Sequence, residues 1–117
     1  MNGLAYNKSK KFSIRIVMPY TFLREEKREY VMSKQILRSG TSIGANLAES
    51  ECAISRADFL SKVYIALKKT METLYWLELL HETKYLSDRQ FTSIYRDAEE
   101  IRKMLSSTTK TINEERM

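Results

Sequence analysis

Apolar residues recur at helical spacing in four stretches that cover almost the whole sequence, and only short polar joints separate them. The expected helices run from about Asn7 to Lys27, from Tyr30 to Cys52, from Ser55 to Tyr85 and from Ser87 onwards. Three glycines and one proline are too few for the many turns of an all-β protein. We therefore predict an all-α fold, a single up-down-up-down four-helix bundle domain over residues 1–117 whose polar tail frays from about residue 108.

Each expected helix has an apolar face that should point to the core. The inward residues are Phe12, Ile16, Tyr20 and Leu23 in the first helix, Leu60, Val63, Leu67, Met71 and Leu74 in the third, and Phe91, Ile94, Ala98, Ile101 and Leu105 in the fourth. Two capping boxes, "SRAD" from Ser55 and "SDRQ" from Ser87, mark the starts of the third and fourth helices. Pro19 should kink the first helix, because proline removes a backbone donor.

Two of the three glycines fall inside the second expected helix, in the stretch "RSGTSIGANLAES". At about 100° per residue, Gly40 and Gly44 share one side of this helix with Ile36, Ile43 and Leu47. Glycine in a helix costs about 1 kcal/mol relative to alanine, so this side should gain something from lacking side chains. We predict a tight crossing with a neighbouring helix; a break of the helix near Gly40 is the alternative.

The chain carries a formal net charge of +5, which allows a polyanionic partner without requiring one. Four cations recur every seven residues in the fourth expected helix and share one stripe. They are Arg89, Arg96, Lys103 and Lys110. Such a stripe can follow the phosphates of a nucleic acid, and Lys62 and Lys69 of the third helix are further candidates for contacts. The alternative is a solvated face with the ion pairs Arg96–Glu100 and Glu99–Lys103.

Some apolar residues of the third helix do not belong to its expected core face. Ile65 and Trp76 lie roughly 120° to 160° from the centre of that face. Together with Leu80 they indicate a second contact surface, which we interpret as a site of subunit packing. Stacking of Trp76 on a nucleobase is the alternative.

The sequence contains no recognisable catalytic motif, and we expect no enzymatic activity, cofactor or metal. Glu78 and His81 have the Glu-x-x-His spacing of di-iron bundles, but such a site needs two of these motifs and His81 is the only histidine. The single Cys52 fits a reducing cytoplasm and is expected to be a small buried thiol. No run approaches the roughly 18 apolar residues of a membrane span. The apolar run near the N-terminus, interrupted by Arg15, lacks a signal-peptide cleavage site.

A polar row on the second helix, Arg38, Ser42, Asn46 and Glu49, reads by itself as a solvated face. With its neighbours, however, this stretch resembles the signature of the small bacterial four-helix bundle proteins encoded in intervening sequences of 23S ribosomal RNA genes. The positions that carry the resemblance are Arg38, Ser42, Ile43, Asn46, Leu47, Ala48 and Glu49. The stretch "FLSKVYIALKKTMETLYWLELLHETKYLS" is similar to the third helix of that family.

The resemblance implies a four-helix bundle that assembles as a ring-shaped homopentamer, and related bundles are thought to bind nucleic acid through a basic ring. Two hypotheses follow for this chain. The first is a non-enzymatic, homo-oligomeric accessory protein of the bacterial cytoplasm that binds RNA or another nucleic acid, with no membrane or small-molecule partner. The second is a protein-interaction scaffold in which the charge serves only solubility.

Overall fold

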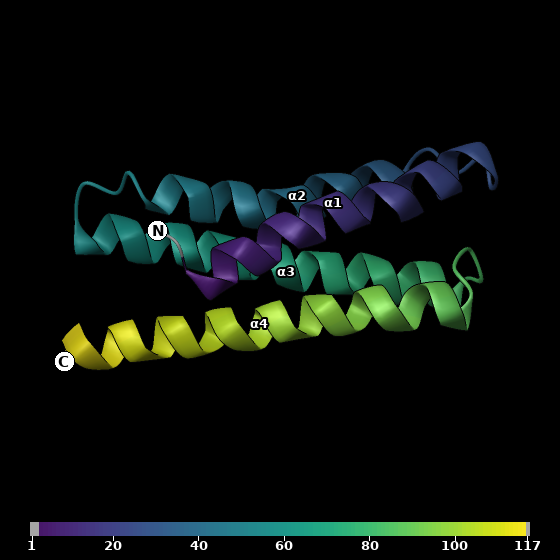
Figure 1. Cartoon of the computed structure of the whole chain (residues 1–117). Coiled ribbons are helices and arrows are strands. Elements are labelled where there is room, and N and C mark those ends of the chain that lie inside the picture. The colour runs from purple at the N-terminus through teal and green to yellow at the C-terminus, as the bar shows by residue number, and fades with distance from the viewer. Residues whose placement is uncertain (1–2, 117) are drawn as a thin grey trace.

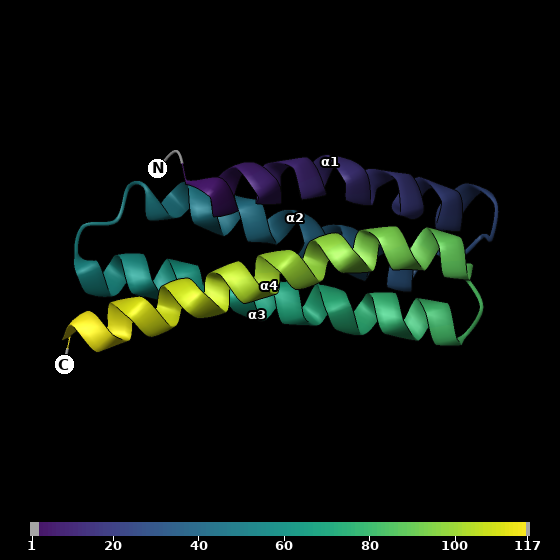
Figure 2. The same ribbon diagram turned by 60° about the horizontal axis from the view of Figure 1, so that its bottom comes forward.

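The computed structural model describes residues 3–116, which form four antiparallel helices in an elongated bundle of 48 × 21 × 21 Å (Figure 1). The helices are α1 (Leu4–Glu25), α2 (Met32–Ser50), α3 (Arg56–Glu82) and α4 (Asp88–Arg116). Each helix packs against its neighbours in sequence, and α1 and α4 meet to close the bundle. Figure 2 shows α1 beside α2 and α4 beside α3. The predicted all-α, up-down-up-down four-helix bundle is confirmed.

The core is a continuous apolar cluster to which all four helices contribute. Most residues predicted to point inward are buried: Phe12, Ile16, Leu23, Leu60, Val63, Leu74, Ile94, Ala98, Ile101 and Leu105. Tyr20, Leu67 and Phe91 are half-buried. Met71 is 52% exposed, so its predicted place in the core is wrong.

The predicted tight crossing involves α1 and α2. Gly40 and Gly44 are both buried inside an uninterrupted α2, so the alternative of a broken helix is wrong. A Cβ atom added to Gly40 would lie 3.0 Å from Cγ1 of Ile16, closer than side chains normally pack. A Cβ atom on Gly44 would lie 3.5 Å from the backbone oxygen of Ser9, at ordinary van der Waals distance. The missing side chains thus let α1 lie directly on α2.

Both predicted capping boxes start their helices. The hydroxyl of Ser55 accepts a hydrogen bond from the Asp58 amide (3.0 Å). Ser87 and Gln90 exchange two bonds: the Gln90 amide donates to the Ser87 hydroxyl (3.2 Å), and the Ser87 amide donates to the Gln90 side chain (2.9 Å). These bonds satisfy amides that have no partner within the helix.

Several helix boundaries differ from the prediction, and two of these differences have a clear physical cause. The second helix begins at Met32 rather than Tyr30, because the Glu29 carboxylate accepts bonds from the amides of Val31, Met32 and Ser33 (2.8–3.2 Å) and so caps the first turn. The fourth helix does not fray near residue 108 but continues to Arg116, with Thr109 and Ile112 buried against the bundle. Pro19 lies inside α1, which continues through it.

Candidate nucleic-acid interface

Four exposed cations follow the outer side of α4. Arg89, Arg96, Lys103 and Lys110, which we call the α4 stripe, are all exposed to solvent. The buried residues Ile94, Ala98, Ile101 and Leu105 occupy the opposite side of the same helix. At 1.5 Å per residue, successive cations are about 10 Å apart along the helix and the stripe is about 31 Å long. The stripe is therefore a row of positive charges that drifts around the helix by about 20° per step and faces away from the core.

The carboxylates in the middle of α4 pair with other cations. Glu99 accepts from the Arg102 guanidinium (2.7 Å), and this bond lowers the pKa of the Glu99 carboxyl. Glu100 pairs with Lys8 of α1 (2.6 Å). The predicted pairs Arg96–Glu100 and Glu99–Lys103 do not form, and no stripe cation has an ion pair within the described part of the chain. No carboxylate of the described residues thus lies at ion-pair distance from a cation of the α4 stripe, although the charge of Lys103 also lowers the pKa of the Glu99 carboxyl.

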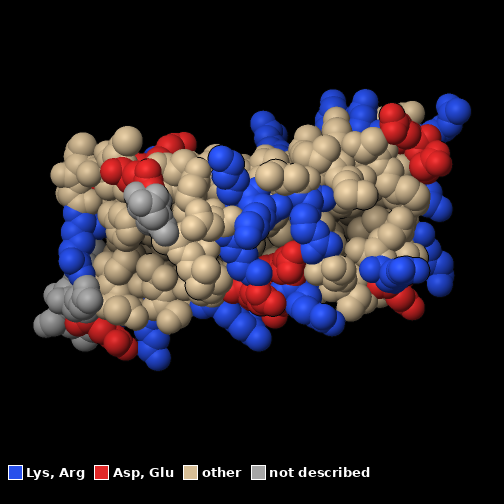
Figure 3. All heavy atoms as spheres, viewed as in Figure 1, with Lys and Arg blue, Asp and Glu red and all other residues tan. Residues whose placement is uncertain are grey.

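The edge of α1 that faces α4 carries three further cations, of which only Lys11 has no ion pair among the described residues. Lys8 pairs with Glu100, while Arg15 pairs with Asp97 and donates to the Ser93 hydroxyl (3.0 Å). Lys11 lies three residues after Lys8 and four before Arg15, so it shares their side of α1 and is exposed. In Figure 3, Lys and Arg side chains gather over the middle of the molecule, with Asp and Glu side chains among them. The sequence could have indicated this basic edge, because α1 has no carboxylate before Glu25.

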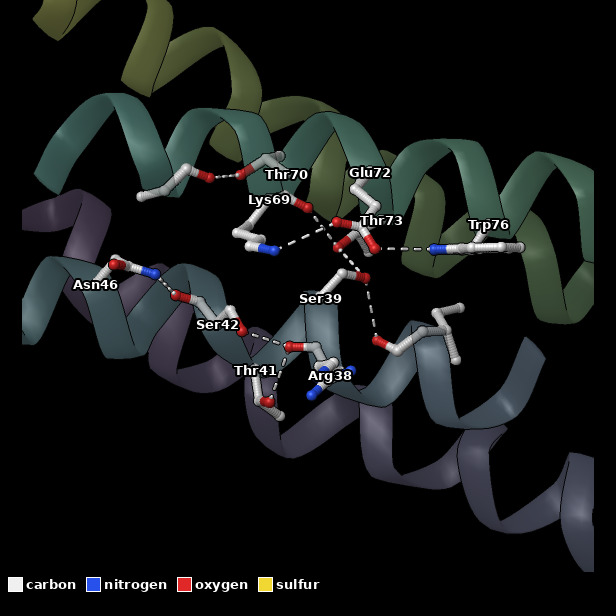
Figure 4. A network of polar contacts seen from close by, with 12 residues as sticks. Arg38, Ser39, Thr41, Ser42, Asn46, Lys69, Thr70, Glu72, Thr73 and Trp76 are labelled. Carbon is white, nitrogen blue, oxygen red and sulfur yellow. Dashed lines mark hydrogen bonds and ion pairs between the residues drawn. The ribbon is translucent and has the colours of Figure 1, made fainter. Parts of the chain in front are cut away.

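The two further candidate cations lie on a different side of the bundle. Lys62 pairs with Glu49 of α2 (3.0 Å), and the hydrogen bond to Glu49 raises the pKa of the Lys62 ammonium. Lys69 pairs with Glu72 (3.5 Å) at the α2–α3 side, as Figure 4 shows. Both cations already have carboxylate partners, and neither joins the α4 stripe.

The polar row of α2 faces the same α2–α3 side. The Ser42 hydroxyl donates to the Arg38 carbonyl (2.6 Å), and the Asn46 side chain donates to the Ser42 carbonyl (2.8 Å; Figure 4). Arg38 and Glu49 are exposed. Of the other motif positions, Ile43 and Leu47 lie in the core and Ala48 is exposed. The row is therefore bonded largely within its own helix, and only Glu49 reaches another one.

The three residues that the sequence assigns to subunit packing do not lie on one surface in the structure. Ile65 and Trp76 are half-buried on the α2–α3 side, and the Trp76 indole donates to Glu72 (3.1 Å). Leu80 has no exposed surface and belongs to the core, so its predicted place on a contact surface is wrong. The error arises because α3 is rotated about its own axis relative to the prediction, so that its core face includes two threonines.

His81 and Cys52 lie at opposite ends of the bundle. His81 is in the last turn of α3, where Nε2 lies 2.6 Å from the Asp88 carboxylate and the ring stacks on Phe91. Cys52 is exposed beyond the end of α2, so the prediction of a buried thiol is wrong.

Within residues 3–116, no three His, Cys, Asp or Glu side chains are grouped as metal ligands would be. In the same residues, no helix combines the length and apolar character needed to cross a membrane.

These features define a basic, all-α four-helix bundle with a stripe of exposed cations that have no ion pair among the described residues. The family model of the 23S rRNA-intervening sequence protein matches residues 2–107, and the chain belongs to this family. A solved structure from Bacteroides thetaiotaomicron, a protein of unknown function from the S23 ribosomal protein family, is 56% identical with a TM-score of 0.89. The match covers 92% of this chain and 96% of that one. No curated protein matches. Neither description names a catalytic activity.

The α3–α4 side contains a tyrosine whose ionisation should affect stability. The Tyr95 hydroxyl donates to Glu78 (2.7 Å); this bond, with burial and the Glu78 charge, raises its pKa to about 12 from 10.0. Since the folded pKa exceeds the unfolded one, the stabilisation is complete below pH 10.0 and is lost as the pH rises to about 12.

We therefore expect the difference in free energy of unfolding between wild type and Tyr95→Phe to shrink over this pH range. Urea denaturation at several pH values measures it, and Tyr75→Phe, at an exposed position, is the control. A constant difference would contradict the role of the Glu78 bond.

Proposed function

We propose that this protein is a non-enzymatic, homo-oligomeric bundle of the cytoplasm that binds RNA through the outer side of α4. The observation that carries the proposal is the α4 stripe, four cations in a row without carboxylate partners among the described residues. Phosphate contacts by such cations release counterions and supply sequence-independent affinity. The family description, which refers to 23S rRNA, is consistent with an RNA partner.

The experiment that tests this function is a salt titration of binding to a labelled fragment of 23S rRNA. Four phosphate contacts predict a log–log slope of about −3 to −4, or about 100-fold weaker binding at 200 mM than at 50 mM salt. The double variant Arg96→Glu/Lys103→Glu should lose most of the affinity. Arg28→Glu/Lys34→Glu changes the same charges at exposed positions off α4 and should bind better than the stripe variant. Absence of binding at low salt would refute the function.

The proposed assembly uses two opposite corners of the bundle. On α1, Ile14 (67% exposed), Val17 and Met18 (76%) form an exposed apolar face. On α3, Met71 and Tyr75 form a second one. Because α1 and α3 lie diagonally across the bundle, these faces can join copies head to tail and leave the α4 stripe open.

Charge complementarity supports a second copy as the occupant. The segment Leu4–Arg24 has five cations and no carboxylate: Lys8, Lys10, Lys11, Arg15 and Arg24. The end of α3, Met71–Glu82, has three carboxylates and no Lys or Arg: Glu72, Glu78 and Glu82. The basic apolar face of one copy is thus complementary to the acidic apolar face of the next, and a heterologous contact of this kind forms a ring when its rotation returns to the first copy.

Light scattering tests the assembly. The wild type should have the mass of an oligomer, which the family resemblance predicts to be a pentamer, whereas Ile14→Asp/Met18→Asp should be a monomer with unchanged helix content. A monomeric wild type would refute it.

A protein-interaction scaffold is the second candidate, and the observation that favours it is the same exposed apolar face of α1. In that case a different polypeptide would occupy the face. Capture of that partner would then be lost in Ile14→Asp/Met18→Asp and unchanged in Arg96→Glu/Lys103→Glu.

A further inference from the structure

The outer side of α4 combines regular charge with a lack of aromatic side chains. Between the stripe cations, the outward positions that the structure describes are occupied by small polar residues such as Ser93 and Ser107, and by Glu100, which Lys8 neutralises. Proteins that hold single-stranded nucleic acid usually stack its bases on aromatic rings, at about 1–3 kcal/mol per base. This surface offers no ring for such stacking.

Both aromatic side chains of α4 are engaged on the side towards α3. Phe91 stacks on His81, with ring centroids 4.1 Å apart, and Tyr95 bonds to Glu78. Tyr64 of α3 accepts a bond from Asn113 (2.6 Å), again between α3 and α4. Trp76 is held at the α2–α3 side by its bond to Glu72. These aromatic rings thus lie at the α3–α4 and α2–α3 sides of the bundle and not on the α4 stripe.

We propose that the α4 stripe binds the phosphate backbone of double-helical RNA in preference to unpaired RNA; this inference rests on the proposed function. A straight α-helix presents its cations at fixed intervals of about 10 Å over about 31 Å. A duplex presents phosphates on an equally rigid surface, and double-stranded RNA is recognised mainly by its shape and backbone. A single strand would have to be ordered along the stripe without stacking energy to offset the lost entropy.

The test compares three labelled probes that share one sequence: an RNA duplex of about 16 base pairs, the length that double-stranded RNA-binding domains span, one of its strands alone, and the corresponding DNA duplex. The RNA duplex should bind about tenfold more tightly than the single strand at low salt, and with a steeper salt dependence. In Arg96→Gln/Lys103→Gln, the slope for the duplex should fall by about 2, one for each lost phosphate contact. The matched control Arg28→Gln/Lys34→Gln should keep the wild-type slope. Thermal unfolding of each variant verifies the fold.

The outcomes separate this inference from the proposed function. Equal affinity for the single strand and the duplex would overturn the preference for double helices and leave RNA binding intact. Tighter binding of the DNA duplex than of the RNA duplex would overturn the assignment to RNA helices. No binding of any probe would refute the function and the inference together. If the stripe variant and its control had the same salt dependence of duplex binding, the phosphate contacts would lie elsewhere than on α4.

Discussion

Replacing Leu80 by alanine is expected to lower the free energy of unfolding by about 2–5 kcal/mol. Leu80 is fully buried in the core, where the bundle can only partly collapse around the missing atoms. Urea denaturation followed by circular dichroism, at one low protein concentration, measures the loss. A residue on a subunit contact, which is how the sequence reads, would instead affect assembly and leave the unfolding of the single chain almost unchanged.

Met71→Ala provides the matched comparison on the same helix. Because Met71 is 52% exposed, its truncation should change the free energy of unfolding by no more than about 0.5 kcal/mol. The sequence pattern predicts the reverse order, with Met71 in the core and Leu80 outside. A larger loss for Met71→Ala than for Leu80→Ala would therefore contradict the rotation of α3 in the structure.

The rotation of α3 could not be predicted from the sequence because threonines occupy its core. Thr70 and Thr73 are fully buried. Their hydroxyls donate to the carbonyls of Ala66 and Lys69 (both 2.8 Å), and the Thr73 hydroxyl also lies 2.9 Å from that of Ser39. Hydroxyls bonded in this way bring their methyl groups inward at little cost. A prediction based on hydrophobicity alone leaves these two positions out of the core and places Met71 there instead.

The other helices were easier to predict because their core faces are apolar or lack side chains. On α2 the buried side consists of Ile36, Gly40, Ile43, Gly44 and Leu47, as the spacing predicts. Capping boxes are local chemistry, so the starts of α3 and α4 follow from four residues each. The end of α4 was harder, because Ile112 is buried only where the other helices of the bundle cover a tail that reads as polar.

The α4 stripe could be predicted from the spacing of its cations, whereas the lack of ion pairs with those cations could not. Local rules assign Glu99 and Glu100 to cations four residues away on the same helix. In the structure Glu100 pairs instead with Lys8 of α1, which follows from the closure of the bundle between its first and last helices. Contacts between residues so far apart in sequence have no local signal. The long-range pair removes Glu100 from Arg96, whereas Glu99 bonds to Arg102 on the same helix instead of pairing with Lys103.

Replacing Gly40 by leucine is expected to lower the free energy of unfolding by about 3 kcal/mol. A Cβ atom at this position would already lie 3.0 Å from Cγ1 of Ile16, so the larger side chain must push α1 away from α2. The gain in helix propensity over glycine, about 1 kcal/mol, is too small to compensate. Chemical denaturation at fixed protein concentration measures the change. An unchanged stability would mean that α1 does not approach α2 as closely as the structure has it.

The same crossing supplies a control of opposite sign and a test of the contact. Gly44→Ala should raise the free energy of unfolding by about 0.5–1 kcal/mol, since its Cβ atom would meet Ser9 only at ordinary distance (3.5 Å) and the helix gains propensity. In Gly40→Leu/Ile16→Ala the new side chain can enter the space that Ile16 vacates. The double variant should therefore lose less stability than the two single losses combined, whereas additive losses would place the cost of Gly40→Leu somewhere other than on Ile16.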